Sequence, residues 1–260
     1  MHPKVSIIIP CYNSEPTLNE TLQSIFDQNY DDWEAIMVND GSPDDLEAVA
    51  SEWVARDERF KYFKKENGGL ASARNYGIKQ ALGNYILPLD SDNKIKPLYL
   101  NKAVSFFEKH AEIDVIYGDA EYFGEKQGVW KVGNYIFEKL LISNYIDACA
   151  LYKKSIWTKA EGYDEQMPYQ GNEDWDFWLR SSVNGAKFFY LEEPCFDYRV
   201  SSSSMIHTFN EDMFKSNRDY VRKKYVNEYF KYFKCYKYQL DYYEKHPIRA
   251  LWKYFKLLFK

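Results

Sequence analysis

The 260-residue sequence predicts an α/β fold, in which a mostly parallel central sheet carries helices on both faces and is followed by a helical C-terminal extension. Short apolar runs bounded by turn residues alternate with amphipathic helical patterns, as in doubly wound sheets. Polar loops follow the apolar runs that end at residues 10, 38 and 89. Right-handed crossovers would bring these three loops to one edge of the sheet.

The first strand is predicted at residues 5–10 and is followed by a helix. Pro10 ends the strand, Ser14 can cap the helix, and Pro16 fits its first turn. The apolar side chains of this helix recur at a spacing that places them on one face. They are Leu18, Leu22, Ile25 and Phe26.

Three more strands are predicted, at residues 35–38, 60–63 and 85–89. The first of these runs into loop 39–42 and the next precedes loop 67–69. Each of the two loops leads into a helical pattern. The strand at 85–89 instead ends abruptly in two carboxylates.

These two carboxylates, Asp90 and Asp92, stand where ligands bind in open α/β sheets, at the carboxyl end of a strand. Residues two apart point the same way if strand geometry persists, so the pair could hold Mg²⁺ or Mn²⁺. Such a cation could neutralise a diphosphate leaving group. A solvated turn is the alternative interpretation of this pair.

Several motifs in this order resemble glycosyltransferase family 2. They lie at residues 5–13, 39–42, 67–75, 90–92 and 171–176, and the resemblance covers about residues 4–205. It implies a GT-A fold with a Rossmann-like, mostly parallel sheet, a nucleotide-sugar donor and a divalent cation. It also implies inversion at the anomeric carbon.

A second acidic pair, Glu173 and Asp174, opens a helix predicted at residues 174–182. By the resemblance Asp174 is the base for the acceptor hydroxyl, and Glu173 positions the acceptor or the loop. Inverting transfer is a single displacement, which needs a base and stabilisation of the departing phosphate but no enzyme nucleophile. The alternative is a structural role, because acidic residues at a helix start interact favourably with the helix dipole.

The resemblance also implies contacts to the donor and the metal. Asp40 is expected to accept a hydrogen bond from the uracil imide, with a turn residue as the alternative. Arg74 is expected to reach a phosphate, with a surface salt bridge as the alternative. The implied donor contacts are Pro10, Tyr12, Asn13, Asp40, Asn67, Gly68, Arg74, Asp90, Ser91 and Arg199, and the implied metal ligands are Asp92, Asp90 and His207.

Two positions depart from the family pattern. Asn39 stands where the family often has Asp, so uracil recognition is assigned to Asp40 alone. Serines occupy residues 201–204, where related enzymes often carry a His for metal or phosphate contacts. His207 is the nearest histidine, and a loop residue without such a role is its alternative.

Composition bounds the class of protein. Aromatic residues make up 18% of the chain, and most of them are expected in the core and in interfaces. The four cysteines show no metal-ligand spacing and suit a reducing cytoplasm. No signal peptide precedes the first strand, and no apolar run reaches the roughly 18 residues of a spanning helix. We therefore expect a cytoplasmic protein.

Charge is distributed unevenly along the chain. Residues 215–260 hold 13 Lys and Arg against 4 Asp and Glu, although the whole chain has a net charge of −5. Within residues 248–260, large apolar side chains recur at helical spacing and basic side chains lie elsewhere on the helix. This pattern is typical of a helix in an anionic membrane interface, here the inner face of the cell membrane, and we expect no nucleic-acid partner. Docking on its own core or on a second subunit is the alternative.

The sequence is accordingly divided into a GT-A domain at residues 1–206 and a basic, aromatic helical extension at 207–260. The domain has a nucleotide-sugar half at about 1–95 and an acceptor half at about 96–206. The predicted function is metal-dependent, inverting transfer from a UDP-sugar to a glycan or lipid-linked glycan in surface polysaccharide biosynthesis. The alternatives are a nucleotidyltransferase acting on a sugar phosphate and a catalytically silent carbohydrate-binding scaffold.

Overall fold

The computed structural model describes residues 2–202, 204 and 209–249. His207 and most of the predicted tail helix lie outside the described residues. The chain divides into two compact units, residues 1–217 and 218–260. The first unit contains the α/β fold and all of the described residues to which the sequence assigns a function.

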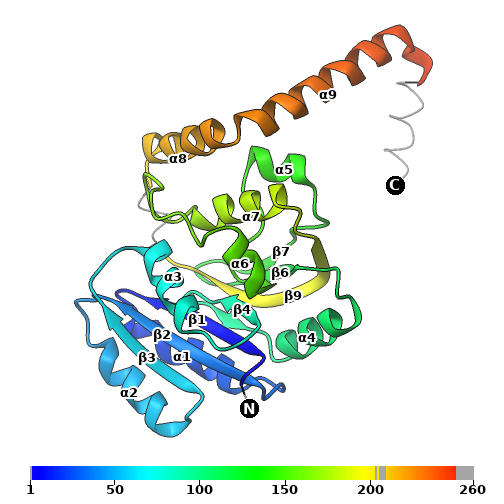
Figure 1. The fold of residues 1–260 in the computed structure, drawn as a ribbon. Coiled ribbons are helices and arrows are strands. Elements are labelled where there is room, and N and C mark those ends of the chain that lie inside the picture. Colours follow the sequence, from blue (N-terminus) through cyan, green and yellow to red (C-terminus); the bar gives the residue numbers. More distant parts are fainter. Residues whose placement is uncertain (1, 203, 205–208, 250–260) are drawn as a thin grey trace. The chain divides into compact units, whose positions relative to one another are not determined.

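Parallel strands form the first half of the sheet (Figure 1). They are β1 (Val5–Cys11), β2 (Trp33–Asp40), β3 (Phe60–Lys65) and β4 (Tyr85–Pro88), in the order β3-β2-β1-β4. Every residue of β1 and β2 is buried, as expected for a parallel sheet covered on both faces. Cys11 of β1 pairs with Asn39 of β2, so the loops after these strands lie side by side. The predicted parallel sheet is confirmed.

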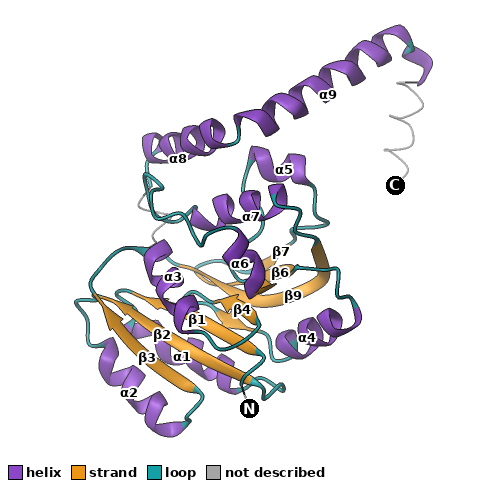
Figure 2. Cartoon of the chain, viewed as in Figure 1, coloured by secondary structure: helices purple, strands orange, loops and turns teal. Residues whose placement is uncertain are grey.

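Helices α1 (Glu15–Phe26) and α2 (Leu46–Arg56) cover one face of this sheet, and α3 (Leu70–Gln80) covers the other (Figure 2). Gly77 permits the close approach of α3. A Cβ at this position would lie only 2.7 Å from the Ile8 side chain of β1. Helices α1, α2 and α3 correspond to the three predicted helices. Their packing on the sheet holds the loops at the carboxyl ends of the strands in place.

The second half of the sheet is mixed. It contains β5 (Lys94–Ile95), β6 (Val115–Gly124), β7 (Gly128–Trp130), β8 (Leu151–Lys153) and β9 (Phe188–Val200). Strand β8 runs antiparallel to both β4 and β6, whereas β6 and β9 are parallel. The helices of this half are α4 (Tyr99–Lys109), α5 (Phe137–Ile142), α6 (Lys154–Lys159) and α7 (Glu173–Val183). The two halves thus form one continuous sheet. This arrangement brings Glu173 and Asp174 close to Asp90 and Asp92.

Two helices follow the sheet, α8 (Glu211–Lys224) and α9 (Val226–Lys245). Helix α9 belongs to the second unit, and none of its described residues is buried. Phe230 and Phe233 are each more than 60% exposed. Among the residues that the structure describes, no helix combines the length and the apolar character that crossing a bilayer requires.

Candidate functional site

The loop after β4 carries the first acidic pair and is fixed from α1. The Ser91 hydroxyl lies 2.6 Å from the Ser14 hydroxyl, and Thr17 donates a hydrogen bond to the Ser91 main-chain carbonyl at 2.9 Å. Ser14 stands at the N-cap position of α1, but its side chain makes no capping hydrogen bond. The predicted capping role of this hydroxyl is therefore wrong, because the hydroxyl bonds to Ser91 and to the main chain of Tyr12 instead.

Arg74 joins the two acidic pairs. Its guanidinium donates to Asp90 at 2.6 Å through Nη2 and to Glu173 through Nη1. Only 1% of Arg74 is exposed, so this is not the surface salt bridge that the sequence left as the alternative. Burial alone would lower the pKa of the guanidinium, but Asp90 and Glu173 outweigh it and raise this pKa well above its usual value. Contact of Arg74 with a phosphate stays a prediction.

Asp174, the predicted base, lies in the first turn of α7 and is nearly buried. Its carboxylate accepts hydrogen bonds from Asn144 Nδ2 at 2.9 Å and from the Trp175 main-chain N–H at 2.7 Å. Burial and the neighbouring Glu173 raise the pKa of Asp174, while Arg74 opposes the shift. In its deprotonated form, a carboxylate with a raised pKa binds a proton more strongly, which suits a general base.

Glu173 is held by other groups of the same site. One oxygen pairs with Arg74, and the other accepts from the Gly171 main-chain N–H at 2.9 Å. Both oxygens therefore bond within the protein, which fits a residue that positions the loop before α7.

Asp92, the predicted metal ligand, lies two residues beyond Asp90. Burial, followed by repulsion from Asp90, raises the pKa of Asp92 to about 6. Within the described part of the chain, no three His, Cys, Asp or Glu side chains form a complete metal-binding set. Mg²⁺ is commonly held by one or two carboxylates together with substrate phosphates, so the pair fits a cation shared with a diphosphate. His207 lies outside the described residues, and its metal role stays a prediction.

Asp147 is a further carboxylate of this site that the sequence did not point to. It lies between α5 and β8 and accepts a hydrogen bond from the Cys149 main-chain N–H at 2.8 Å. Burial, followed by repulsion from Asp90, raises the pKa of Asp147 to about 7. A single aspartate in the mostly apolar segment 145–151 was the only signal, because it has no partner at a recognisable spacing.

Asp40 holds the loop that precedes α3. Its buried carboxylate pairs with Lys65 Nζ at 2.6 Å and accepts the main-chain N–H groups of Gly68 and Gly69 at 3.0 and 2.7 Å. These contacts order the segment that leads to Arg74. Uracil recognition by Asp40 stays a prediction, and it would share this carboxylate with the three internal donors.

The other expected nucleotide contacts lie around the end of β1. Pro10 is buried in the strand, whereas Tyr12 is 51% exposed. Asn13 has a φ of +54° and donates its main-chain N–H to the Ser42 hydroxyl at 2.7 Å. Asn67 is exposed. The structure thus leaves the Tyr12 ring and the Asn67 amide accessible to a nucleotide.

Arg199 bonds to the loop after β4, at Asp92 and Asn93, through both its main chain and its side chain. Its N–H donates to Asn93 Oδ1 at 2.9 Å, and its guanidinium donates to the Asp92 main-chain carbonyl at 3.0 Å and pairs with Glu20 at 2.9 Å. This residue therefore anchors the loop that carries Asp92. Its contact with a diphosphate stays a prediction.

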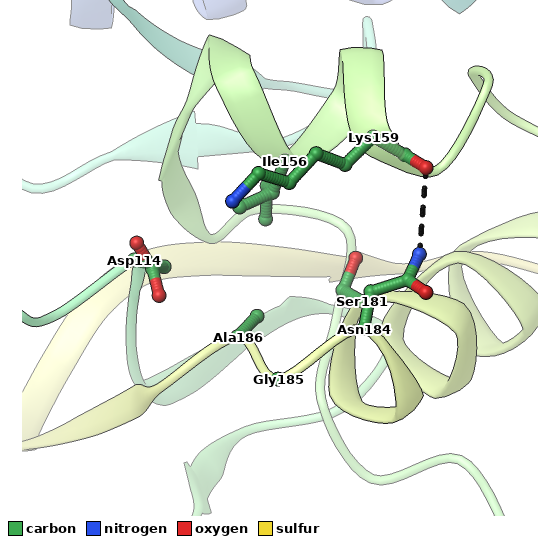
Figure 3. Close-up of a pocket in the computed structure, with 7 residues that line it drawn as sticks. All are labelled: Asp114, Ile156, Lys159, Ser181, Asn184, Gly185 and Ala186. Carbon is green, nitrogen blue, oxygen red and sulfur yellow. Dashed lines mark hydrogen bonds between the residues drawn. The ribbon is translucent and has the colours of Figure 1, made fainter.

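A small cavity lies away from these carboxylates, between α6, α7 and the segments that lead into β6 and β9 (Figure 3). Its volume of about 30 Å³ has room for about one water molecule. Asn184 Nδ2 donates to the Lys159 main-chain carbonyl at 3.4 Å across one side of it. A nucleotide or a sugar does not fit there, so the cavity is not the functional site.

Comparisons with known proteins agree with this geometry. The family model described as glycosyl transferase family 2 matches residues 6–160. An uncharacterised glycosyltransferase of Rickettsia typhi is 35% identical over 217 residues, which are 79% of this chain and 64% of that protein. The minor teichoic acid biosynthesis protein GgaB of Bacillus subtilis is 40% identical over 115 residues, 43% of this chain and 13% of that protein.

Among solved structures, the fold is similar to that of S. aureus TarS 1–349 in complex with UDP-GlcNAc. The TM-score is 0.68 at 21% sequence identity, and the match covers 82% of this chain and 64% of that one. The predicted GT-A fold is confirmed by this likeness. The matched parts cover 64% of the Rickettsia typhi protein and 64% of TarS 1–349, in each case just under two thirds of the length, and 13% of GgaB. Because the family model matches more than half of its residues, the chain belongs to glycosyl transferase family 2.

Proposed function

We propose that the protein transfers a sugar from a UDP-sugar to a hydroxyl of an acceptor glycan, with inversion at the anomeric carbon. The observation that carries this proposal is the buried Arg74, which pairs with Asp90 on one side and Glu173 on the other. It joins the loop suited to a diphosphate and its cation to the helix that carries the base. Donor activation and proton abstraction therefore belong to one site.

The donor is proposed to be a UDP-sugar. Three observations support this choice: the exposed ring of Tyr12, the carboxylate of Asp40, and the fold shared with a protein solved with UDP-GlcNAc. A carboxylate that accepts from the uracil imide N–H would favour uridine over the other bases.

A divalent cation, Mn²⁺ or Mg²⁺, is proposed to bind at Asp92, with Asp90 contacting ribose or a metal-bound water. Such an ion neutralises the charge that develops on the departing diphosphate. Asp92 provides a partly buried oxygen ligand, and Arg199 and Thr17 hold the main chain of the loop in place through hydrogen bonds to the carbonyls of Asp92 and Ser91. Arg74 orients Asp90 through their ion pair at 2.6 Å.

Asp174 is proposed to take the proton of the acceptor hydroxyl as its oxygen bonds to the anomeric carbon. The bond from that carbon to the diphosphate breaks, and UDP leaves with the electron pair. The attacking oxygen and the departing phosphate lie on opposite faces of the sugar, which gives inversion. Asn144 and the Trp175 main chain orient the carboxylate for this transfer.

The acceptor is proposed to be a glycan or lipid-linked glycan in surface polysaccharide biosynthesis. The support is the likeness to a minor teichoic acid biosynthesis protein over part of the chain, and the basic, aromatic tail. With that tail we propose a cytoplasmic protein that binds peripherally at the inner face of the cell membrane.

A donor-hydrolysis screen tests this function. The purified protein is incubated with UDP- and GDP-sugars and Mn²⁺, and free nucleoside diphosphate is measured. We expect slow release of UDP from at least one UDP-sugar, and none from the Asp92→Asn variant. Release of pyrophosphate from a nucleoside triphosphate and a sugar phosphate would instead show a nucleotidyltransferase. Absence of all turnover, with intact saccharide binding, would favour the silent scaffold.

A further inference from the structure

The β6–β7 hairpin and the end of β9 carry three aromatic side chains that the proposed chemistry does not use. Tyr122 and Trp130 lie nearly parallel, with an interplanar angle of 3° and ring centroids 6.1 Å apart. Tyr198 meets Trp130 edge-on at 5.7 Å and Tyr122 at 6.1 Å. We call Tyr122, Trp130 and Tyr198 the aromatic shelf.

The shelf remains open to solvent on part of its surface. All three side chains are partly exposed. Tyr122 pairs across the hairpin with Gly128, and a Cβ at Gly128 would meet nothing within 4 Å. The space on the Cβ side of Gly128 is therefore open, beside the strand position that Tyr122 occupies. Lys126 Nζ lies 3.7 Å from the centre of the Tyr122 ring, which places a hydrogen-bond donor beside the shelf.

One end of the shelf adjoins the loop after β4 that carries Asp90 and Asp92. Tyr198 directly precedes Arg199, whose main-chain N–H bonds to Asn93 and whose guanidinium bonds to the main chain of Asp92. Strand β5, which follows Asn93, also pairs with β9 at Asp197. Burial raises the pKa of the Tyr198 hydroxyl, and Asp147, Asp90 and Asp92 raise it further, as expected for a ring close to these carboxylates.

The other end of the shelf is linked to the base. The chain runs from Trp130 to Val132, whose main-chain carbonyl accepts a hydrogen bond from Lys139 of α5. The segment after α5 then delivers Asn144, whose amide bonds to Asp174. The shelf is therefore connected through Arg199 to the loop after β4, and through Val132, α5 and Asn144 to the helix that carries the proposed base.

We propose that the aromatic shelf binds a pyranose ring of the acceptor glycan by stacking. The apolar C–H face of a pyranose matches an aromatic face, while its hydroxyls need donors and acceptors at the rim, such as Lys126. A ring on Tyr122 would take the place of the Lys126 ammonium, which could then donate to a sugar hydroxyl. This inference rests on the proposed function and adds the site that orients the acceptor.

Saturation-transfer NMR on the full chain tests the proposal. The probes are di- and trisaccharides of glucose, galactose and N-acetylglucosamine, each measured with UDP and Mn²⁺ present. We expect saturation of the ring C–H protons of at least one probe by the wild-type protein. Trp130→Ala and Tyr122→Leu should each reduce that signal at least fivefold, whereas Trp130→Phe should retain part of it. Phe233→Ala, an exposed aromatic on α9, is the matched control and should change nothing.

UDP affinity, measured by calorimetry on the same samples, separates the possible failures. Retained UDP binding shows that a variant is folded, and Tyr122→Leu decides the matter if Trp130→Ala does not fold. Unchanged saccharide saturation in the folded shelf variants, or no saturation of any probe by the wild type, would overturn the shelf. Loss of UDP binding by the wild type would overturn the donor assignment, and the saccharide signal would still decide the shelf.

Discussion

At the scale of single residues, the site is an acidic cluster with one buried cation in contact with it. Arg74 pairs directly with both Asp90 and Glu173, and its single positive charge compensates one of their two negative charges. The pKa values of Asp92, Asp147 and Asp174 are all raised, first by burial. Repulsion between neighbouring carboxylates adds to this effect for Asp92 and Asp147. A bound divalent cation would reduce the repulsion and favour the deprotonated carboxylates that it needs as ligands.

Asp92→Asn should retain the fold and lose metal-dependent turnover, because a neutral amide is a poorer ligand for a hard cation. The measurement is Mn²⁺-dependent UDP release, with circular dichroism as the test of folding. Asp31→Asn is the matched control, since the Asp31 side chain is 97% exposed. Wild-type Mn²⁺ dependence in Asp92→Asn would contradict the assignment.

Asp174→Asn should lower sugar transfer by about 10²–10⁴-fold, the usual contribution of a general base. UDP affinity should change little, because the base acts on the acceptor. Calorimetry with UDP and a transfer assay on the same samples provide the two values. If UDP binding disappears together with activity, Asp174 serves the donor site or the fold instead.

The pH dependence of stability isolates Asp147. Its pKa is raised from 3.8 to about 7, so the folded protein holds this proton over a range where the unfolded chain releases it. The free energy of unfolding should therefore fall as the pH rises from about 4 to about 7. In thermal melts without added metal, the melting temperature of Asp147→Asn should fall less between pH 4 and pH 7 than that of the wild type. Parallel curves for the two proteins would show that Asp147 keeps an ordinary pKa.

At the scale of elements, Arg74 makes α3 the connection between the loop after β4 and the start of α7. The three elements come from distant parts of the chain, and the sheet only brings their ends near one another. The ion pairs of Arg74 fix the positions of these ends relative to one another. The neighbouring Asn75 provides a further link from α3, because its side-chain amide forms hydrogen bonds of 2.9 and 2.7 Å with the Tyr163 main chain.

Arg74→Met should destabilise the protein by about 3–5 kcal/mol, because it leaves Asp90 and Glu173 without their buried partner. Urea unfolding measures this loss. Adding Glu173→Gln to Arg74→Met should restore part of it by removing one uncompensated charge. The exposed Arg222→Met serves as the control. A cost below about 1 kcal/mol would show that the bridge does not hold these elements together.

At the scale of the whole molecule, a largely acidic catalytic unit is joined to a basic C-terminal unit. From the sequence, six large apolar side chains recur on one side of residues 248–260. Each contributes roughly 1.5–3 kcal/mol when fully buried, and each cation adds about 1 kcal/mol near an anionic leaflet. A helix that inserts only partly gains only part of this free energy. We therefore expect reversible, salt-sensitive binding to the membrane.

Removal of residues 247–260 should release the protein from anionic vesicles and leave UDP affinity unchanged. Co-sedimentation with phosphatidylserine-containing vesicles and thermal melts provide the measurements. Changing Arg249, Lys253, Lys256 and Lys260 to Gln is the matched variant and should weaken binding less than the truncation does. A large fall in melting temperature on truncation would show that the tail packs on the protein itself.

Much of the fold was determined by the sequence alone. Apolar runs of strand length, turn residues and helical periodicity act over a few neighbouring residues, so they predicted the parallel strands, their helices and the edge that carries Asp90 and Asp92. The capping role of Ser14 failed for the same reason. Its hydroxyl has a tertiary partner, Ser91, 77 residues away, which a local pattern cannot contain.

Only the tertiary structure decided how the site is held together. Arg74 and Glu173 are 99 residues apart, and Asp147 has no local signature, yet packing brings all three to the same carboxylate cluster. The aromatic shelf depends in the same way on the pairing of β6 with β7 and β9. Side-chain contacts between distant segments follow from the packing of the whole domain, because burial and charge compensation are properties of the assembled site.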